Sequence, residues 1–469
     1  MPLGVISMKV RKLKAATALG SLTASVALLA GMAGAHAQGA GSFPGSFLVP
    51  GTQTSFKVGG YVKLDYTYDF GAQQNINGGA GPIGLALDSG PPHLRGDGTL
   101  ITPLADDAHH IHGTSQMTAS ESRFNIETRT PTAYGELKTF IEGDFPDPNG
   151  LNHSNSLHVN SNSYGFRLRE AYGTLGPFLA GQTASLFRDS DAEAETLDFG
   201  GPQSTGVTRQ PQVRYTFDFG NGLTWAVAAE NPQTQIFDVD DSSSSGFETT
   251  LGAKQGDKIP DFTTAVVYTA PWGHLNLHFV ARELYWHNGV SSAPVVEGSS
   301  SSTFGWGIGF SGTWNVPIGK DAVSWEAAYG EGAGRYINSD GPPTPDAFLT
   351  SSFDNLITGL GTRERVLKAI PAWLVNANYV HFWTDTLRST IAGSYWHQDN
   401  KNGVGANQSD SNDNPSLLWK SAYTAHVNLI WSPVEQTNFG VEFIRMQGKL
   451  ESGQKGDLTR LQASAQFKF

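Results

Sequence analysis

The chain has 469 residues, a net charge of −12 at pH 7 and no cysteine, so disulfide bonds do not hold it together. It contains 55 Gly, 26 Phe, 14 Tyr and 11 Trp, yet its mean hydropathy is only −0.28, an unusual balance for a soluble core. No apolar run after residue 37 is long enough for a membrane-spanning helix, and no low-complexity linker divides the chain into separate soluble domains.

The first residues predict a secretory signal peptide. A basic stretch, "KVRKLK", precedes the apolar segment "AATALGSLTASVALLAGMAG", and the small-x-small motif "AHA" ends at residue 37. We expect residues 1–37 to be the signal peptide and residues 38–54 to be a short periplasmic segment. A membrane-spanning anchor is the alternative interpretation of residues 1–37.

Alternation of apolar and polar residues predicts β-strands along the rest of the chain. Residues 56–70 place Val62, Leu64 and Phe70 on one face and Lys63 and Asp65 on the other. With this first segment there are about sixteen in total. The others are 123–130, 133–145, 164–175, 178–186, 212–219, 223–230, 262–269, 274–285, 304–315, 322–330, 369–380, 386–397, 421–431, 437–446 and 458–469.

The connections between these strands alternate between long and short. The short ones are "PT" at 131–132, "GP" at 176–177, "GNG" at 220–222, "APWG" at 270–273, "VPIGK" at 316–320, "HFWTD" at 381–385 and "SPVEQ" at 432–436. Strict alternation places all short turns at one end and all long loops at the other. The sequence therefore predicts an all-β transmembrane antiparallel barrel of residues 55–469, with short periplasmic turns and long extracellular loops. A large soluble sandwich or propeller is the alternative.

In such a barrel the apolar face of the final strand, "LQASAQFKF", faces lipid. Aromatic residues near strand ends, Trp306 with Trp314 and Tyr423 with Trp431, fit two interface girdles.

A barrel of this size has a water-filled lumen, so function is expected on inward side chains. The inward arginines are Arg123, Arg129, Arg167, Arg169, Arg214 and Arg388. Clustered guanidinium groups attract carboxylates through paired hydrogen bonds. The alternative is that they pair with Glu127, Glu136, Glu142 and Asp144 and only stiffen the wall.

Residues 187–211 are expected to fold inward as a constriction loop. This loop carries acids against two arginines: Arg188, Asp189, Asp191, Glu193, Glu195, Asp198 and Arg209. If its acids face the arginine wall, they create a transverse field that selects permeating ions. An ordinary solvated surface loop is the alternative.

Other motifs carry weaker signals. "HHIH" at 109–112 has the spacing of a metal site and "DVDD" at 238–241 could hold calcium, but hydrated loop residues are the simpler interpretation. No Gly-x-Ser-x-Gly motif or other catalytic constellation is present. We therefore expect no enzymatic activity, no cofactor and no resident metal.

Several phrases resemble the DcaP-like outer-membrane porin family. They are "FLVPGTQTSFKVGGYVKLDYTYD", "ESRFNIETRTPTAYGELKTFIEGDF", "FRLREAYGTLGPFLAGQTASLFRD", "ETLDFGGP" and "RQPQVRYT". The resemblance implies a sixteen-stranded trimeric barrel that takes up small anionic compounds, often dicarboxylates. It implies functional roles for the basic positions Arg123, Arg167, Arg169, Arg209 and Arg214.

The sequence departs from the family in two places. Only residues 38–54 stand where many members carry a helical extension, and the family's "GQTWS" is "GQTAS" at residues 181–185. These changes affect the expected assembly and the shape of the constriction.

Together these observations predict a homotrimeric porin of the bacterial outer membrane. It would contact lipid and pass small hydrophilic solutes by diffusion, with a preference for anions. One alternative is a specific channel for carboxylates or sugars, where Tyr61, Phe140 and Trp396 would form an aromatic path. Another is a structural or adhesive barrel whose long loops bind partners.

Overall fold

The computed structural model describes residues 39–73, 110–111, 113–145, 165–202, 208–238, 247–249, 257–287, 300–338, 345–353, 363–401, 419–451, 453 and 455–469. The expected signal peptide lies outside these residues. The chain divides into two units, Met1–Lys57 and Val58–Phe469. In the first unit, β1 (Phe47–Leu48) pairs antiparallel with the start of β2 (Ser55–Gln73).

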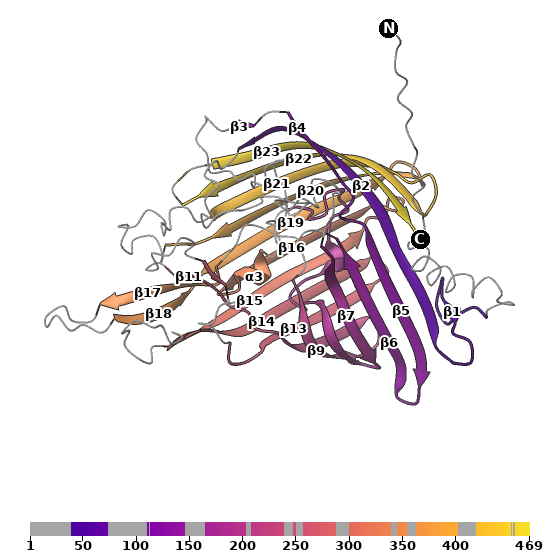
Figure 1. The fold of residues 1–469 in the computed structure, drawn as a ribbon, viewed down its shortest axis with the longest axis horizontal. Coiled ribbons are helices and arrows are strands. Elements are labelled where there is room, and N and C mark those ends of the chain that lie inside the picture. The colour runs from indigo at the N-terminus through magenta and orange to yellow at the C-terminus, as the bar shows by residue number, and fades with distance from the viewer. Residues whose placement is uncertain are drawn as a thin grey trace, which may run out of the picture. The chain divides into compact units, whose positions relative to one another are not determined.

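Sixteen antiparallel strands in the described part of the second unit close into a barrel, which confirms the predicted fold (Figure 1). The last strand, β23 (Lys455–Lys468), pairs with β2, so the sheet has no free edge. The second barrel strand is broken into β3 (His110–Ile111), β4 (Thr114–Thr118) and β5 (Arg123–Thr132), which all pair with β2.

The remaining barrel strands each pair with their neighbours along the chain. They are β6 (Gly135–Asp144), β7 (Arg167–Leu175), β8 (Phe178–Ala184), β9 (Arg209–Asp218), β10 (Leu223–Glu230), β13 (Asp261–Ala270), β14 (Gly273–His287), β15 (Ser300–Asn315), β16 (Ala322–Glu331), β19 (Pro371–Phe382), β20 (Leu387–Gln398), β21 (Trp419–Trp431) and β22 (Thr437–Leu450). Each strand overlaps one predicted from the sequence.

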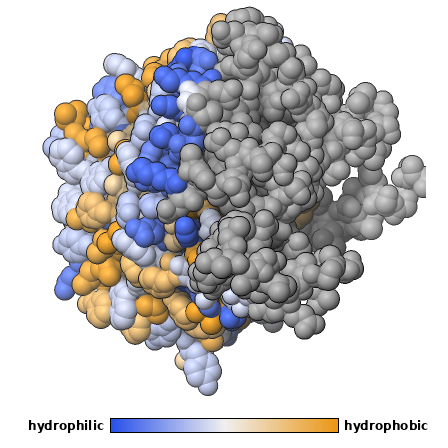
Figure 2. Space-filling model, turned by 90° about the vertical axis from the view of Figure 1, so that its left-hand side faces the viewer, coloured by the Kyte–Doolittle hydropathy of each residue, from blue (hydrophilic) through white to orange (hydrophobic). Residues whose placement is uncertain are grey.

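In the barrel wall apolar side chains are exposed and polar ones are buried, the reverse of a soluble protein. On β23 the apolar Leu461 and Phe467 are 39% and 50% exposed, whereas Arg460 and Gln462 are buried. The same alternation holds on β2, where Lys63 and Asp65 are buried while Val62 and Leu64 are 54% and 48% exposed. Figure 2 shows patches of hydrophobic residues on the coloured part of the surface. A soluble monomer rarely exposes so much apolar surface. The polar residues therefore face the interior of the barrel and the apolar ones face outward.

The short connections lie where the sequence places them, but in three of them the strands continue into the predicted turn. The turn predicted at 270–273 is reduced to 271–272, and the one predicted at 381–385 begins only after β19 ends at Phe382. The turn after β5 is formed by Ala133 and Tyr134, because Pro131 and Thr132 still pair with β6. Proline is tolerated there because the strand is ending.

Two long connections contain structure that strand periodicity does not reveal. They supply a small sheet with the strand order β12 (Phe247–Thr249), β11 (Gln235–Asp238), β17 (Ala347–Phe353) and β18 (Arg363–Ala369). β17 and β18 project to the left in Figure 1. Ile236 and Leu349 of this sheet pack in one apolar cluster with Leu284 and Trp286 of β14, which attaches the small sheet to the barrel wall.

An apolar cluster also lies on the inward side of the wall. It contains Phe187 and joins Leu374, Trp396 and Ile444 with Tyr336, which belongs to the short helix α3 (Gly334–Ile337). No helix among the described residues is long and apolar enough to span a membrane.

Candidate functional site

The 187–211 loop begins against the inner face of the barrel. Just before it, Ser185 Oγ and the Leu186 amide both donate to Glu230 Oε1 of β10, at 3.0 and 3.1 Å. Arg188 Nη1 then lies 3.2 Å from Glu326 Oε1 of β16. These partners occupy inward positions of the barrel strands, so the first residues of the loop lie inside the barrel.

The middle of the loop continues along the inner wall. Asp189 Oδ2 accepts a hydrogen bond from Ser311 Oγ at 2.7 Å and lies 2.8 Å from His274 Nε2, which fixes it to β14 and β15. The 3₁₀ helix η3 (Ser190–Ala192) follows, and its last carbonyl accepts from Asn378 Nδ2 of β19 at 3.2 Å. The loop therefore crosses several strands within a few residues.

Glu195 attaches the loop to strands β20 and β21. Its carboxylate accepts from Arg388 Nε of β20 at 2.7 Å, and its carbonyl accepts from Asn428 Nδ2 of β21 at 2.8 Å. The inward Arg388 is therefore paired with the loop.

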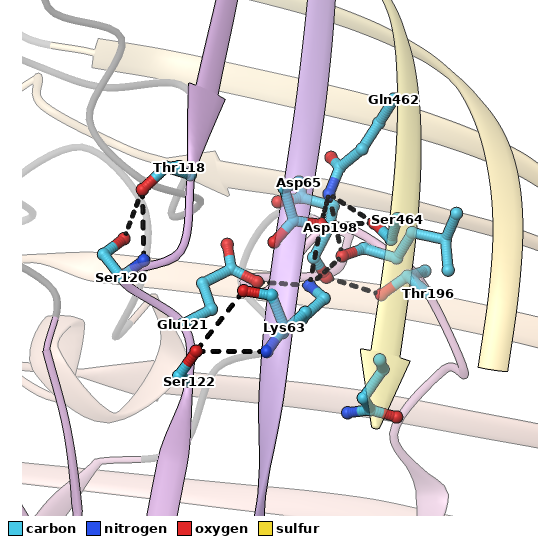
Figure 3. A network of polar contacts seen from close by, with 12 residues as sticks. Lys63, Asp65, Thr118, Ser120, Glu121, Ser122, Thr196, Asp198, Gln462 and Ser464 are labelled. Carbon is cyan, nitrogen blue, oxygen red and sulfur yellow. Dashed lines mark hydrogen bonds and ion pairs between the residues drawn. The ribbon is translucent and has the colours of Figure 1, made fainter. Parts of the chain in front are cut away.

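The peptide groups of Leu197 are held by Glu442 on one side and by Lys63 and Gln462 on the other. Lys63 and Gln462 are labelled in Figure 3. The Leu197 amide donates to Glu442 Oε2 of β22 at 2.7 Å. Its carbonyl accepts from Lys63 Nζ of β2 at 2.7 Å and from Gln462 Nε2 of β23 at 2.9 Å. Lys63 also forms an ion pair with Glu121, which precedes β5. These bonds anchor the far part of the loop to the strands that close the barrel.

Three arginines gather on the wall formed by β5, β6 and β7, and we call them the arginine cluster: Arg123, Arg167 and Arg169. Asp144 accepts two hydrogen bonds from Arg167, at 2.9 and 2.8 Å, and one from Arg169 at 2.8 Å. Glu142 lies 2.9 Å from Arg169 Nε and 3.4 Å from Arg123 Nη1. A bulge between β6 and β7 allows both Arg167 and Arg169 to reach Asp144.

The exposed charge of the arginine cluster is mostly positive. The Asp144 side chain is fully buried, whereas that of its partner Arg167 is 36% exposed. Glu142 is 12% exposed and Arg123 is 19% exposed. In the Arg167–Asp144 pair the guanidinium is therefore exposed and the carboxylate lies behind it, whereas Arg169 is only 5% exposed. Three cations share two anions.

The aromatic ring of Phe199, on the 187–211 loop, lies against all three members of the arginine cluster. The Cζ atoms of Arg123, Arg167 and Arg169 are 5.4, 5.7 and 5.1 Å from the centre of the ring. These distances are within the range of cation–π attraction. The ring therefore connects the loop to the arginine wall.

The remaining predicted wall residues have partners of their own. Arg129 pairs with Glu127 at 2.6 Å and with Glu136 at 3.6 Å. On β9, Arg209 lies 3.7 Å from Glu170, and Arg214 Nη2 donates to the Ala184 carbonyl at 2.6 Å. Ion pairing, which the sequence left as an alternative, therefore occurs for several arginines. It coexists with exposed guanidinium groups in the arginine cluster.

The acids and bases of the 187–211 loop divide into two groups. Arg188 and Asp189 are buried against the wall, whereas Asp191 and Glu193 are exposed. The first pair anchors the loop and the second pair faces water.

Several residues of the site were not found from the sequence. Lys63, Glu121, Glu442 and Phe199 all act through contacts with segments far away in the chain. An inward position for Lys63 and Glu442 follows from strand alternation, but no local signal identifies their partners.

The connection between β16 and β19, which contains α3, also contacts the inner wall. Tyr336 of α3 donates to Asp261 Oδ2 at 2.8 Å, and Gln210 Nε2 donates to Tyr336 Oη at 2.8 Å. Burial, together with the carboxylates of Asp261 and Glu230, raises the pKa of Tyr336 well above its ordinary value. The tyrosine therefore stays protonated and ties this connection to the end of the 187–211 loop.

The aromatic residues proposed for a sugar path do not lie together. Tyr61 contacts Arg123, and Phe140 lies 5.7 Å from Tyr172. Trp396 is fully buried in the apolar cluster. Among the described residues no ring contact joins these three. The histidines of "HHIH" and the acids of "DVDD" lie outside the side chains that the structure describes.

Comparisons with known proteins agree with this geometry. Residues 43–443 match the model of a family described as "Porin subfamily". Porin Omp2b of Brucella suis is 25% identical over 241 residues, which cover 49% of this chain and 53% of that protein, and Omp2b of its biovar 1 (strain 1330) is 24% identical over 234 residues, 49% and 52% respectively. The chain therefore spans about half the length of these curated relatives.

A solved structure covers far more of the chain. The outer membrane channel DcaP of Acinetobacter baumannii superposes with a TM-score of 0.64 at 18% identity, covering 92% of this chain and all of that one. At this identity the similarity concerns the fold.

Proposed function

Since the chain belongs to the porin subfamily, a family of outer-membrane β-barrel channels, we propose that it lets small hydrophilic solutes diffuse passively across the bacterial outer membrane and favours anionic, carboxylate-bearing ones. Porins are channels and not enzymes. The membrane location accounts for the exposed apolar faces of the strands, which contact lipid.

The proposed preference for anions rests on the Arg167–Asp144 ion pair, in which only the positively charged partner is exposed. A solute in the lumen meets the guanidinium of Arg167, whose side chain is 36% exposed, while the carboxylate of Asp144 is fully buried behind it. Guanidinium groups bind carboxylates through two parallel hydrogen bonds. The surplus cation of the arginine cluster supplies the net positive charge.

The 187–211 loop narrows the channel in this proposal. Its bonds to β14, β15 and β19–β23 hold it along the inner wall, and its exposed acids Asp191 and Glu193 contribute negative charge to the same lumen. Charges of opposite sign across a narrow passage orient a dipolar solute.

Export and assembly complete the proposal. Residues 1–37 act as the export signal, residues 38–54 lie on the periplasmic side, and three barrels associate as a homotrimer. Light scattering of the detergent-solubilised protein tests the trimer, and N-terminal sequencing of the exported protein tests the cleavage site.

The decisive test is the reversal potential of the protein in a planar bilayer under a KCl gradient. We expect a potential that favours chloride and becomes smaller when Arg167 and Arg169 are both replaced by alanine. A potential that favours potassium and does not change with this double substitution contradicts the anion preference but leaves the channel intact. Absence of any conductance contradicts the channel itself.

A further inference from the structure

The motif "ETLDFGGP", residues 195–202, places an aromatic ring where three like charges meet. The guanidinium groups of Arg123, Arg167 and Arg169 share only Glu142 and Asp144 as anionic partners among the described residues. Three cations so close together repel one another, and two carboxylates do not neutralise them. The two carboxylates leave one positive charge over, so a further attractive group would stabilise the convergence of the three arginines.

The face of the Phe199 ring can supply that attraction. All three Cζ atoms lie between 5.1 and 5.7 Å from its centre. The electron-rich face of a benzene ring attracts cations at this distance, and it does so without adding a negative charge. Arg123 has a second ring, Tyr61, also at 5.4 Å. The cluster therefore keeps its net positive charge while it remains ordered.

The backbone around Phe199 is fixed on both sides. Before it, Leu197 is held by the wall at both its amide and its carbonyl. Around it, the Asp198 carbonyl accepts from Thr196 Oγ1 at 2.9 Å and from the Gly201 amide at 3.1 Å. Gly201 has a φ of 66°, which glycine adopts without strain. The ring is therefore presented to the arginine cluster by a rigid turn.

We propose that Phe199 is the positioning residue of the arginine cluster, and that its ring sets the anion selectivity of the channel by holding three guanidinium groups together without neutralising them. This inference rests on the proposed function. An acidic residue at this position would order the arginines equally well but cancel their charge, whereas the aromatic ring preserves it.

The test combines substitutions of the ring and of the arginines. Phe199→Leu removes the ring face and keeps an apolar side chain of similar size, and Phe199→Tyr keeps the ring. We expect Phe199→Leu to lower the chloride-to-potassium permeability ratio about two- to threefold. Phe199→Tyr should keep the ratio of the unsubstituted protein. If Phe199→Leu does not insert into membranes, Phe199→Met makes the same comparison.

A double-mutant cycle separates positioning from a general displacement of the loop. In a background where Arg123, Arg167 and Arg169 are all glutamine, Phe199→Leu should have no further effect on the permeability ratio. A shift of the same size in that background overturns the proposal, because the ring would then act without the arginines.

The same measurements distinguish this proposal from the proposed function. If the glutamine background loses chloride preference and Phe199→Leu alone does not, Phe199 is not the positioning residue and the anion-selective channel stands. If the glutamine background leaves the permeability ratio unchanged, the arginine cluster does not set the ion preference, and the roles proposed for Arg167 and for Phe199 are both wrong.

Discussion

Asp144 is the carboxylate that two members of the arginine cluster, Arg167 and Arg169, share. It is fully buried and accepts hydrogen bonds from both Arg167 and Arg169. Asp144→Asn leaves two guanidinium groups without their shared carboxylate, and removal of one partner of a buried pair is costly. We expect the free energy of unfolding to fall by roughly 3 kcal/mol, measured by urea titration in detergent.

The matched control for this substitution is Glu136→Gln. Glu136 is half exposed and lies 3.6 Å from Arg129, so its loss should cost less than about 1 kcal/mol. Equal losses for the two substitutions would contradict the central place of Asp144.

Asp321, in the turn before β16, makes the stability of the fold depend on pH. Its carboxylate accepts from Tyr379 Oη at 2.5 Å and from the Phe382 amide at 2.9 Å, and it lies 2.7 Å from His381 Nδ1. These hydrogen bonds, that of Tyr379 first, lower the pKa of Asp321 to about 2. A carboxyl group with a lowered pKa stabilises the fold above its unfolded pKa of about 3.9 and loses this effect as the pH falls towards 2.

We therefore expect Asp321→Asn to lower the unfolding temperature at pH 7, with a difference from the unsubstituted protein that shrinks between pH 4 and pH 2. Thermal melts followed by circular dichroism across this range measure it. Asp385→Asn is the control, because Asp385 is largely exposed beside Lys320 and should change the melt little. A difference that does not vary with pH would show that Asp321 acts through packing alone.

The 187–211 loop depends on a small residue in the facing strand. A Cβ atom added to Gly440 on β22 would lie 2.8 Å from both terminal carbons of Leu197, the residue whose peptide groups are clamped by the wall. Gly440→Val should push Leu197 away and loosen the loop. We expect single-channel conductance to change and current noise to increase in planar bilayers.

Gly173→Val is the control for this loop prediction. A Cβ atom at Gly173 meets its nearest neighbour at an ordinary 3.5 Å, so this variant should conduct normally. If Gly440→Val also conducts normally, Leu197 does not hold the loop in the lumen.

Closure of the whole barrel can be tested by a disulfide bond, because the native chain has no cysteine. Tyr66 of β2 lies directly opposite Ala463 of β23. Opposite residues in antiparallel strands have Cβ atoms close enough for a disulfide. Tyr66→Cys with Ala463→Cys should cross-link under oxidising conditions and change the mobility of the denatured protein on a non-reducing gel.

The control pair combines Tyr66→Cys with Phe467→Cys. Phe467 pairs with Val62, further along the same strand, so these two cysteines are too far apart to react in a closed barrel. Equal cross-linking of both pairs would indicate a different register between the first and last strands.

The strands and their number were predictable from the sequence because a barrel wall is a local pattern. Each strand has water on one side and an apolar environment on the other, so alternate residues must differ in polarity, as in Leu461, Gln462 and Ala463. Short turns such as 220–222 are equally local. The same alternation assigns Arg167 and Arg169 to inward positions, and the family resemblance adds only the expectation that they have a functional role.

The course of the 187–211 loop and the pairing of charges were decided by the tertiary structure. Leu197 meets Lys63, Glu442 and Gln462, residues that come together only after the first and last strands have closed the barrel. The burial of Asp144 behind Arg167, and the ring of Phe199 against the arginine cluster, arise in the same way. Alternation along a strand determines which side a residue faces, because that depends on its immediate neighbours. Which charge it meets there depends on segments brought together from across the chain.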